Sequence, residues 1–299
     1  MESAGSQAQQ PAAEDRSDEP AIKPGAVRLR VGDLDRQRAF YQRAIGLRHL
    51  GEANGSVQLG VDGATVVELV STPSASPRPP RTTGLFHLAI LVPDRPALAQ
   101  SLARVAGAGW RLTGASDHLV SEALYLNDPE GNGIEIYRDR PRSEWRYDGG
   151  SLQMSTLPLD LDDLLAELPG TESQDSGMSA GTRIGHVHLN VANLEEAESF
   201  YAGLLGFDVT VRGYPGALFL STGGYHHHLG VNTWAGPGAP APPRDSRGLV
   251  WFELAVEDAA ALDETRARLE SAGVEVDADD DGLRTSDPSG NGVLLRCAR

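Results

Sequence analysis

The sequence predicts an α+β fold in which four βαβββ modules form two open β-barrel-like domains, and internal repeats carry this prediction. The strand-like segment AVRLRV at residues 26–31 is followed by a Phe-Tyr pair and a glycine. The segment HVHLNV at residues 186–191 is followed by the same residues at the same spacing. A second repeat pairs NDPEGNGIE at residues 127–135 with SDPSGNGVL at residues 286–294. Two different segments that each occur twice predict a duplicated pair of modules.

The four modules are expected at residues 24–72, 84–140, 182–236 and 247–298. In the first module, a strand at Ala26–Val31 leads into a helix at Asp33–Ile45, because that helix begins with a capping aspartate and is followed by Gly46. Apolar residues at strand spacing predict further strands at Ser56–Val61 and Ala64–Val70.

By residue range, the chain divides into a tail, a first pair of modules, a linker and a second pair. We expect a disordered tail at residues 1–23, because this segment has almost no large apolar residues. Residues 24–140 hold the first pair, residues 141–181 the linker and residues 182–299 the second pair. The linker is long enough either to connect the two halves plainly or to pack as a lid near the mouth of a site.

Composition argues against several classes of function. A net charge of −16 and a pI of about 4.9 argue against nucleic acid or an anionic membrane surface as partners. No apolar run approaches the roughly 20 residues of a transmembrane helix, and no signal peptide follows Met1. The single cysteine, Cys297, excludes an internal disulfide, so the expected location is the cytoplasm.

The stretch SDHLVSEALYLNDPEGNGIEIY at residues 116–137 combines a histidine, a tyrosine, a tight turn and a carboxylate. His118 precedes an apolar-Tyr pair that ends at Tyr125, and an Asp-Pro-x-Gly turn is followed by Glu135 between two isoleucines. In a strand, Glu135 points opposite to its neighbours. It therefore faces either water or an interior group that needs a carboxylate.

This pattern resembles the signature of the extradiol ring-cleavage dioxygenases of the vicinal-oxygen-chelate superfamily, although Ser116 departs from the usual residue at its position. The whole chain after residue 24, including GLFHLAIL, DRPR, IGHVHLNV and GGYHHHLG, is similar to the CatE-like catechol 2,3-dioxygenases. The resemblance implies that Glu135 is a metal ligand and that Tyr125 donates a hydrogen bond near the substrate. It implies that His118 either lies next to the metal ligands or contacts the substrate.

In that superfamily two modules pair into one barrel, and the metal ligands come from first and last strands. Superposing the first strands aligns Ala26, His87, His186 and Trp251. Only modules 2 and 3 keep a metal-binding side chain there, and with Glu135 they supply a 2-His-1-carboxylate set, which suits non-haem Fe(II). Modules 2 and 3 are therefore expected to pair around the metal, and modules 1 and 4 to form a structural barrel.

Two choices stay open at this metal. His188 rivals His186 because both lie on one strand face, but the superposition aligns His188 with Ala89 rather than with His87, which makes it the second choice. The ligand set accepts Mn(II) as well as Fe(II).

The His-His-His run at residues 226–228 supplies a candidate acid or base. Matching Gly63 to Gly223 aims His228 at the barrel interior and leaves one or other of its neighbouring histidines to face solvent. The resemblance implies that His228 acts as acid/base beside bound oxygen, a role that suits the pKa of imidazole. A fourth metal ligand is the competing role for His228.

The function that the resemblance implies is extradiol cleavage of a catechol-type substrate, with both atoms of O2 inserted at a mononuclear Fe(II) centre to give a hydroxymuconate semialdehyde-type product. The partners are then a small aromatic diol and O2, and the chain is compatible with a homo-oligomer. Asn232 and Trp234 continue the inward face of His228 and are candidates to line the substrate pocket. The alternatives are a glyoxalase-type metal-dependent isomerase or lyase, and a bleomycin-resistance-like binding protein without catalysis.

Overall fold

The structure, a computed structural model, describes residues 21–53, 55–148, 151–168, 177–279 and 282–298. Module 1 contains β1 (Ile22–Val31), α1 (Leu34–Phe40), η1 (Tyr41–Ile45), β2 (Arg48–Ala53), β3 (Ser56–Val61) and β4 (Ala64–Ser71). Module 2 contains β5 (Gly84–Leu91), α2 (Arg95–Gly107), β6 (Gly114–Asp117), β7 (Ser121–Asn127) and β8 (Gly133–Asp139). The linker contains η2 (Arg142–Glu144), β9 (Tyr147–Asp148), β10 (Ser151–Leu152), β11 (Leu157–Pro158) and α3 (Leu161–Leu165).

Modules 3 and 4 repeat this plan. Module 3 contains β12 (Arg183–Asn190), α4 (Leu194–Glu198), η3 (Ser199–Leu204), β13 (Asp208–Val211), β14 (Ala217–Ser221) and β15 (Leu229–Asn232). Module 4 contains β16 (Gly248–Val256), α5 (Ala259–Ser271), β17 (Asp277–Asp279), β18 (Gly282–Ser286) and β19 (Gly292–Cys297). In every module the first strand pairs in parallel with the last, so the helix between them is a crossover.

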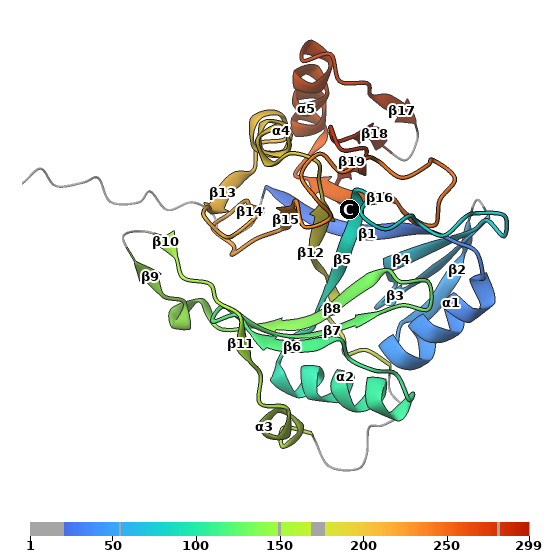
Figure 1. The fold of residues 1–299 in the computed structure, drawn as a ribbon, viewed down its shortest axis with the longest axis vertical. Helices are drawn as coiled ribbons and strands as arrows, with labels where there is room; N and C mark the ends of the chain where they lie inside the picture. Colours follow the sequence, from blue (N-terminus) through green and yellow to red (C-terminus); the bar gives the residue numbers. More distant parts are fainter. Residues whose placement is uncertain (1–20, 54, 149–150, 169–176, 280–281, 299) are drawn as a thin grey trace, which may run out of the picture.

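Two large mixed sheets organise these modules (Figure 1). The eight strands of modules 1 and 4 follow the order β17-β18-β19-β16-β1-β4-β3-β2. The nine strands of the other sheet follow the order β11-β6-β7-β8-β5-β12-β15-β14-β13, which joins module 2, module 3 and one linker strand. The strand order confirms the predicted fold and the predicted pairing of modules 2 and 3. The residue ranges predicted for the domains stay a prediction, and residues 1–20 of the predicted tail lie outside the described residues.

The two sheets share one apolar core. The first strand of each module contributes a fully buried side chain to the same cluster, namely Val27, Leu88, Val187 and Phe252. In Figure 1, α2 lies along one face of β6, β7 and β8, so that this part of the nine-stranded sheet is covered on that side. Apolar burial on this scale is the main favourable term in folding, and here it also sets the positions of the central strands.

Helix boundaries follow local sequence signals. The carboxylate of Asp33 accepts a hydrogen bond from the Arg36 backbone N–H, as an N-cap should, and Gly46 ends the first helical segment with φ +94°. The predicted helix over 33–45 is in fact an α-helix followed by a π-helical turn. In module 1, strand β2 is the element that the sequence prediction did not resolve.

The Asp-Pro-x-Gly-Asn-Gly turns join the two sheets. Oδ1 of Asp128 accepts from the backbone N–H groups of Glu130 and Asn132, while Oδ2 accepts from the hydroxyl of Tyr41 at 3.3 Å. The same arrangement recurs in module 4, where the hydroxyl of Tyr201 donates to Oδ2 of Asp287 at 2.9 Å. Each tyrosine lies in the helical segment of a module of one sheet, and each aspartate lies in a turn of a module of the other sheet, so the repeated motif is a structural clamp.

The lengths of the helices show whether any of them could span a membrane. The helices α2 and α5 have 13 residues each. Within the described ranges, no helix combines the length and the apolar character that a membrane span requires.

We expect Tyr201→Phe to lower the free energy of unfolding by about 1–3 kcal/mol, because it removes a donor from the buried Asp287 carboxyl group. Tyr41→Phe should have a smaller effect, since its hydrogen bond to Asp128 is longer. Urea unfolding followed by circular dichroism measures both changes, with Tyr147→Phe, at an exposed position, as the matched control. Equal stability of Tyr201→Phe and the control would contradict the clamp.

Candidate metal centre

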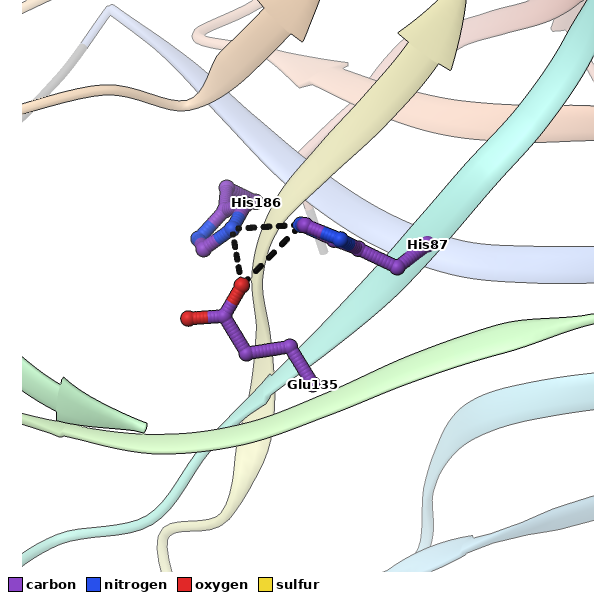
Figure 2. Close-up of side chains that lie close together, drawn as sticks. All are labelled: His87, Glu135 and His186. Carbon is purple, nitrogen blue, oxygen red and sulfur yellow. Dashed lines mark hydrogen bonds and ion pairs between the residues drawn. The ribbon is translucent and has the colours of Figure 1, made fainter. Parts of the chain in front are cut away.

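Three side chains of the nine-stranded sheet converge on one point (Figure 2). Nε2 of His87 lies 3.0 Å from Oε2 of Glu135, and Nε2 of His186 lies 3.1 Å from the same oxygen. The two imidazole Nε2 atoms are 3.3 Å apart. All three side chains are buried, and they form a group that could hold a metal ion. The structure thus brings together the three residues predicted as ligands.

Strand register explains the convergence. Ala89 on β5 pairs with His186 on the antiparallel strand β12 and with Glu135 on the parallel strand β8. Residues opposite one another in a sheet point to the same face, and His87, two residues before Ala89, points there as well. The small side chain of Ala89 leaves room for its three larger neighbours to meet.

The charges of this site favour metal binding at neutral pH. Burial raises the pKa of Glu135, but the neighbouring imidazoles of His186 and His87 outweigh it and hold the carboxyl pKa well below its usual value. Burial lowers the pKa of His186 to about 4. An ionised carboxylate and a neutral imidazole are the forms that bind metal ions.

The donor set fits a divalent transition metal. Adjacent ligands of an octahedral ion with bonds of about 2.1 Å lie about 3.0 Å apart, close to the donor spacings of 3.0–3.3 Å. Three donors on one face leave the opposite face open, as in the 2-His-1-carboxylate sites of non-haem iron enzymes. His87, Glu135 and His186 are therefore the residues that would hold such an ion.

The three donors lie in the wall of a cavity of about 460 Å³. Its wall includes Phe86, Trp234 and Phe219, together with Tyr125 and His118. A cavity of this size with aromatic walls and a few polar groups is typical of a small-molecule site.

Tyr125 and His118 form a hydrogen-bonded pair in this wall. The Tyr125 hydroxyl lies 2.7 Å from Nε2 of His118, and Nδ1 of His118 lies 2.7 Å from the backbone oxygen of Ser155. Because that oxygen can only accept, Nδ1 carries the proton, and in a neutral ring Nε2 accepts from the tyrosine. Burial, followed by the Glu135 charge, raises the pKa of Tyr125 well above its usual value, so the hydroxyl stays protonated.

The linker contributes to the same cavity. Met154, Ser155 and Thr156 line it, and the Thr156 hydroxyl lies 3.3 Å from that of Tyr214 in module 3. Strand β11 then pairs with β6 at the edge of the sheet. Of the two readings of the linker, packing at the site is the one observed.

The comparisons with known proteins agree with this geometry. The sequence matches the Glyoxalase/Bleomycin resistance protein/Dioxygenase superfamily over residues 23–136 and 183–294. The chain belongs to this superfamily. It is 43% identical over 269 residues to a catechol-2,3-dioxygenase of Bacillus subtilis (strain 168), a match that covers 88% of this chain and 93% of that protein. The predicted resemblance is confirmed.

Solved structures of other proteins share this fold. A putative dioxygenase from Bacillus subtilis subsp. subtilis str. 168 matches with a TM-score of 0.66 at 12% identity, covering 94% of this chain and 87% of that one. Glyoxalase I from Zea mays matches with a TM-score of 0.56 at 16% identity, covering 92% of each chain. At these identities the two matches support the fold alone.

His188 lies in the cavity wall but outside the three-donor group. It pairs with His87 across β5 and β12, and its ring packs against Phe86 and Trp234 at centroid distances of 5.1 and 5.3 Å. Its Nε2 is buried without a hydrogen-bond partner among the described residues.

The expectation that His228 faces the barrel interior is wrong. Nδ1 of His228 lies 3.0 Å from the Ser221 hydroxyl and 3.3 Å from the Thr222 backbone nitrogen, and His227 occupies the cavity wall instead. Residues 222–228 form turns and bends before β15 begins, so strand alternation does not apply to them. Neither neighbour of His228 faces solvent, because His226 and His227 are both buried.

The strand register shows which residue does correspond to Glu135 in module 3. In module 2 the register sets Ala89 against Glu135, and in module 3 it sets His188 against Gly230. Gly230, two residues beyond His228, is therefore the counterpart. A Cβ atom at Gly230 would lie 2.9 Å from the His188 ring, so this ring occupies the space of the missing side chain.

Of the two predicted pocket residues, one lines the cavity and the other does not. Trp234 lines the cavity with 46% of its surface exposed, next to Phe86, which is 40% exposed. Asn232 is fully buried outside the cavity wall, where its Oδ1 accepts from the Trp234 backbone N–H at 3.0 Å. The expectation that Asn232 lines the pocket is therefore wrong.

Phe86 and His227 are among the wall residues that sequence reasoning missed. The His-rich run indicated that one of its histidines could act in the site, but it did not show whether His227 or His228 points into the cavity. Phe86 directly precedes His87, so simple alternation puts it on the opposite face; a register shift between β5 and β12 at this point changes that.

Fe(II) binding tests the choice between the two histidines of β12. We expect His186→Ala to weaken Fe(II) binding by more than about 100-fold, since even the loss of a residue that only orients a ligand costs 10–100-fold. His188→Ala, changed on the same strand face, should keep the metal. Metal content after anaerobic loading and desalting measures both, and loss of metal from His188→Ala alone would contradict the assignment.

Proposed function

We propose that this protein is an extradiol ring-cleaving dioxygenase that inserts both atoms of O2 into a catechol-type substrate and gives a hydroxymuconate semialdehyde-type product. The observation that carries the proposal is a buried His87–Glu135–His186 donor set in the wall of an aromatic cavity, in a chain 43% identical to a catechol-2,3-dioxygenase. We further propose Fe(II) as the resident metal and the cytoplasm as the location.

The chemistry divides between the metal and the chain. Bound Fe(II) would supply the electron transfer between the diol and O2, which the side chains of the site cannot provide. The chain binds the aromatic ring, holds its hydroxyl groups and takes up protons. The aromatic side chains of Phe86, Trp234 and Phe219 provide the apolar surface for the ring.

Tyr125 is the residue that orients the substrate oxygens. The resemblance implied that Tyr125 donates near the substrate. We propose instead that its proton is directed to His118, so that the lone pairs of its hydroxyl oxygen accept from a substrate hydroxyl. The carbonyl of Ser155 fixes the tautomer of His118 and thus the direction of the tyrosine proton. His118 acts on the substrate through Tyr125 in this arrangement.

His227 takes the acid/base role that was expected for His228. Nε2 of His226 lies 2.8 Å from Oδ1 of Asp139, and Nδ1 of His226 lies 2.7 Å from Nδ1 of His227. Because the carboxylate accepts, Nε2 of His226 carries its proton, and its Nδ1 in the neutral ring accepts from Nδ1–H of His227. Nε2 of His227 is then left unprotonated and can take a proton from the diol.

Two features argue against the alternative functions. A glyoxalase-type site usually has a fourth protein ligand, and the counterpart of Glu135 in module 3 is Gly230, which has no side chain. A metal-free binding protein would hold a buried carboxylate and two imidazoles with their donor atoms within 3.3 Å of one another and no ion to bind. Burial of such groups is costly unless they are paired or coordinate a metal.

The proposal is tested by O2 consumption. Protein reconstituted anaerobically with Fe(II) should consume O2 when catechol is added and release a yellow ring-opened product. His87→Ala and Glu135→Ala should abolish both signals. Metal binding without O2 consumption, over a panel of substituted catechols, would contradict the dioxygenase and favour an isomerase or lyase.

The adjacent histidines give a matched pair for the acid/base role. We expect His227→Gln to lower kcat for catechol cleavage by about 10²–10⁴-fold, the usual contribution of a general base, with Fe(II) content unchanged. His228→Gln should change kcat by less than about threefold, because its ring lies outside the cavity wall. The reverse order of effects would contradict this assignment.

A further inference from the structure

The sheet of modules 1 and 4 carries a second cavity, at the place that corresponds to the metal pocket. Its volume is about 840 Å³. Trp251 and Val293 line it, and they are the module 4 counterparts of His87 and Ile134, which line the metal pocket. The duplication of the modules has therefore also duplicated a cavity.

Modules 1 and 4 have no metal-binding side chains at the positions of the three donors. The counterparts of His186, His87 and Glu135 are Ala26, Trp251 and Leu294. These three apolar side chains are buried together in a small cluster of their own. Of these three side chains only Trp251 lines the second cavity, so none of its counterpart positions offers a metal donor.

Arginines replace the histidines as the polar groups of the second cavity. Five of them line it, namely Arg30, Arg78, Arg244, Arg247 and Arg284. The acidic residues of the wall are Glu275 and Asp277, and both are exposed. In a chain with a net charge of −16, this excess of positive charge is concentrated at one place.

Backbone carbonyls hold two of these guanidinium groups without neutralising them. Nη1 of Arg30 donates to two carbonyls of the neighbouring loop at 2.6 and 3.2 Å, and Nη1 of Arg78 donates to the Leu85 carbonyl at 2.7 Å. Arg247 differs from them, because it donates to a carbonyl at 2.9 Å but also forms an ion pair with Glu130 at 3.6 Å. A carbonyl orients an arginine but carries no net charge, so an anion in the cavity gains both charge attraction and fixed donors.

Two further observations define the ligand. The Ser246 hydroxyl is buried in the cavity wall and has no hydrogen-bond partner within the described chain. Leu249, Val250 and Trp251 supply an apolar surface beside the arginines. A ligand that satisfies both parts has an anionic group at one end and an apolar body at the other.

We propose that this second cavity binds a small aromatic carboxylic acid. The arginines and Ser246 hold the carboxylate, and the ring lies against Trp251 and Leu249. The site is separate from the metal centre, and binding there needs neither Fe(II) nor O2.

Benzoate is the probe for this site. Isothermal titration of the full-length protein should show one saturable benzoate site per chain, with an affinity at least about tenfold higher than for benzamide, which has the same ring without the charge. Inorganic phosphate, an anion without an apolar body, should also bind at least about tenfold more weakly. Equal binding of benzoate and phosphate, or no saturable benzoate binding, would overturn the proposal.

Variants locate the binding. Val250→Glu places a carboxylate among the arginines and should weaken benzoate binding by at least about tenfold, whereas Val250→Gln, of equal size but neutral, should weaken it by less than about threefold. His87→Ala should leave benzoate binding unchanged, and loss of binding in that variant would place benzoate in the metal pocket and overturn the proposal.

Arg244→Gln removes one positive charge at an exposed position and provides a variant that does not depend on the fold tolerating Val250→Glu. It should weaken benzoate binding by about threefold, as expected for one partly solvated charge. Arg266→Gln, on the exposed face of α5, is the control and should have no effect. Identical affinities of these two variants would overturn the proposal.

Discussion

The antiparallel pairing of β5 with β12 is the constraint on which the metal centre depends. These are the first strands of modules 2 and 3, which lie far apart in the sequence, and their pairing sets His186 opposite Ala89. Strand β8 then brings Glu135 to the other side of Ala89. A shift of this register by one residue would turn every side chain of one strand to the opposite face, and the donor set would be lost.

The two sheets show how one scaffold supports different chemistry. Each sheet is built around the antiparallel first strands of two modules, and each has a cavity on corresponding strands. In one sheet, histidines and a glutamate point into the cavity. In the other, apolar side chains stand at the equivalent strand positions, and arginines line the cavity beside them. The tyrosine–aspartate clamps join the sheets, so the cavities are held at fixed positions in one apolar core.

Module 3 is also asymmetric with respect to module 2. Glu135 has no counterpart carboxylate, because Gly230 stands at the equivalent position and His188 fills the space. The third module instead contributes His227, which is linked through His226 to Asp139 of module 2. Under the proposed function, module 2 therefore supplies the carboxylate that binds the metal, and module 3 supplies the histidine that transfers a proton.

Much of the fold followed from the sequence because repeats report topology directly. Two repeated segments predicted four modules, and the loss of donors from modules 1 and 4 predicted that modules 2 and 3 pair. The direction of His228 could not be predicted, because the match of Gly63 to Gly223 placed the closing strand of module 3 two residues out of register. The second cavity was also beyond sequence reasoning, since its arginines come from segments as distant as Arg30 and Arg284.

The most direct test of the central claim is the position of iron in a crystal of the Fe(II)-loaded protein, measured by anomalous diffraction at the iron absorption edge. The proposal predicts one strong peak per chain, bounded by Nε2 of His87, Nε2 of His186 and Oε2 of Glu135. A peak at the His226–His227 pair, or at His188 with His186 outside the coordination sphere, would contradict it.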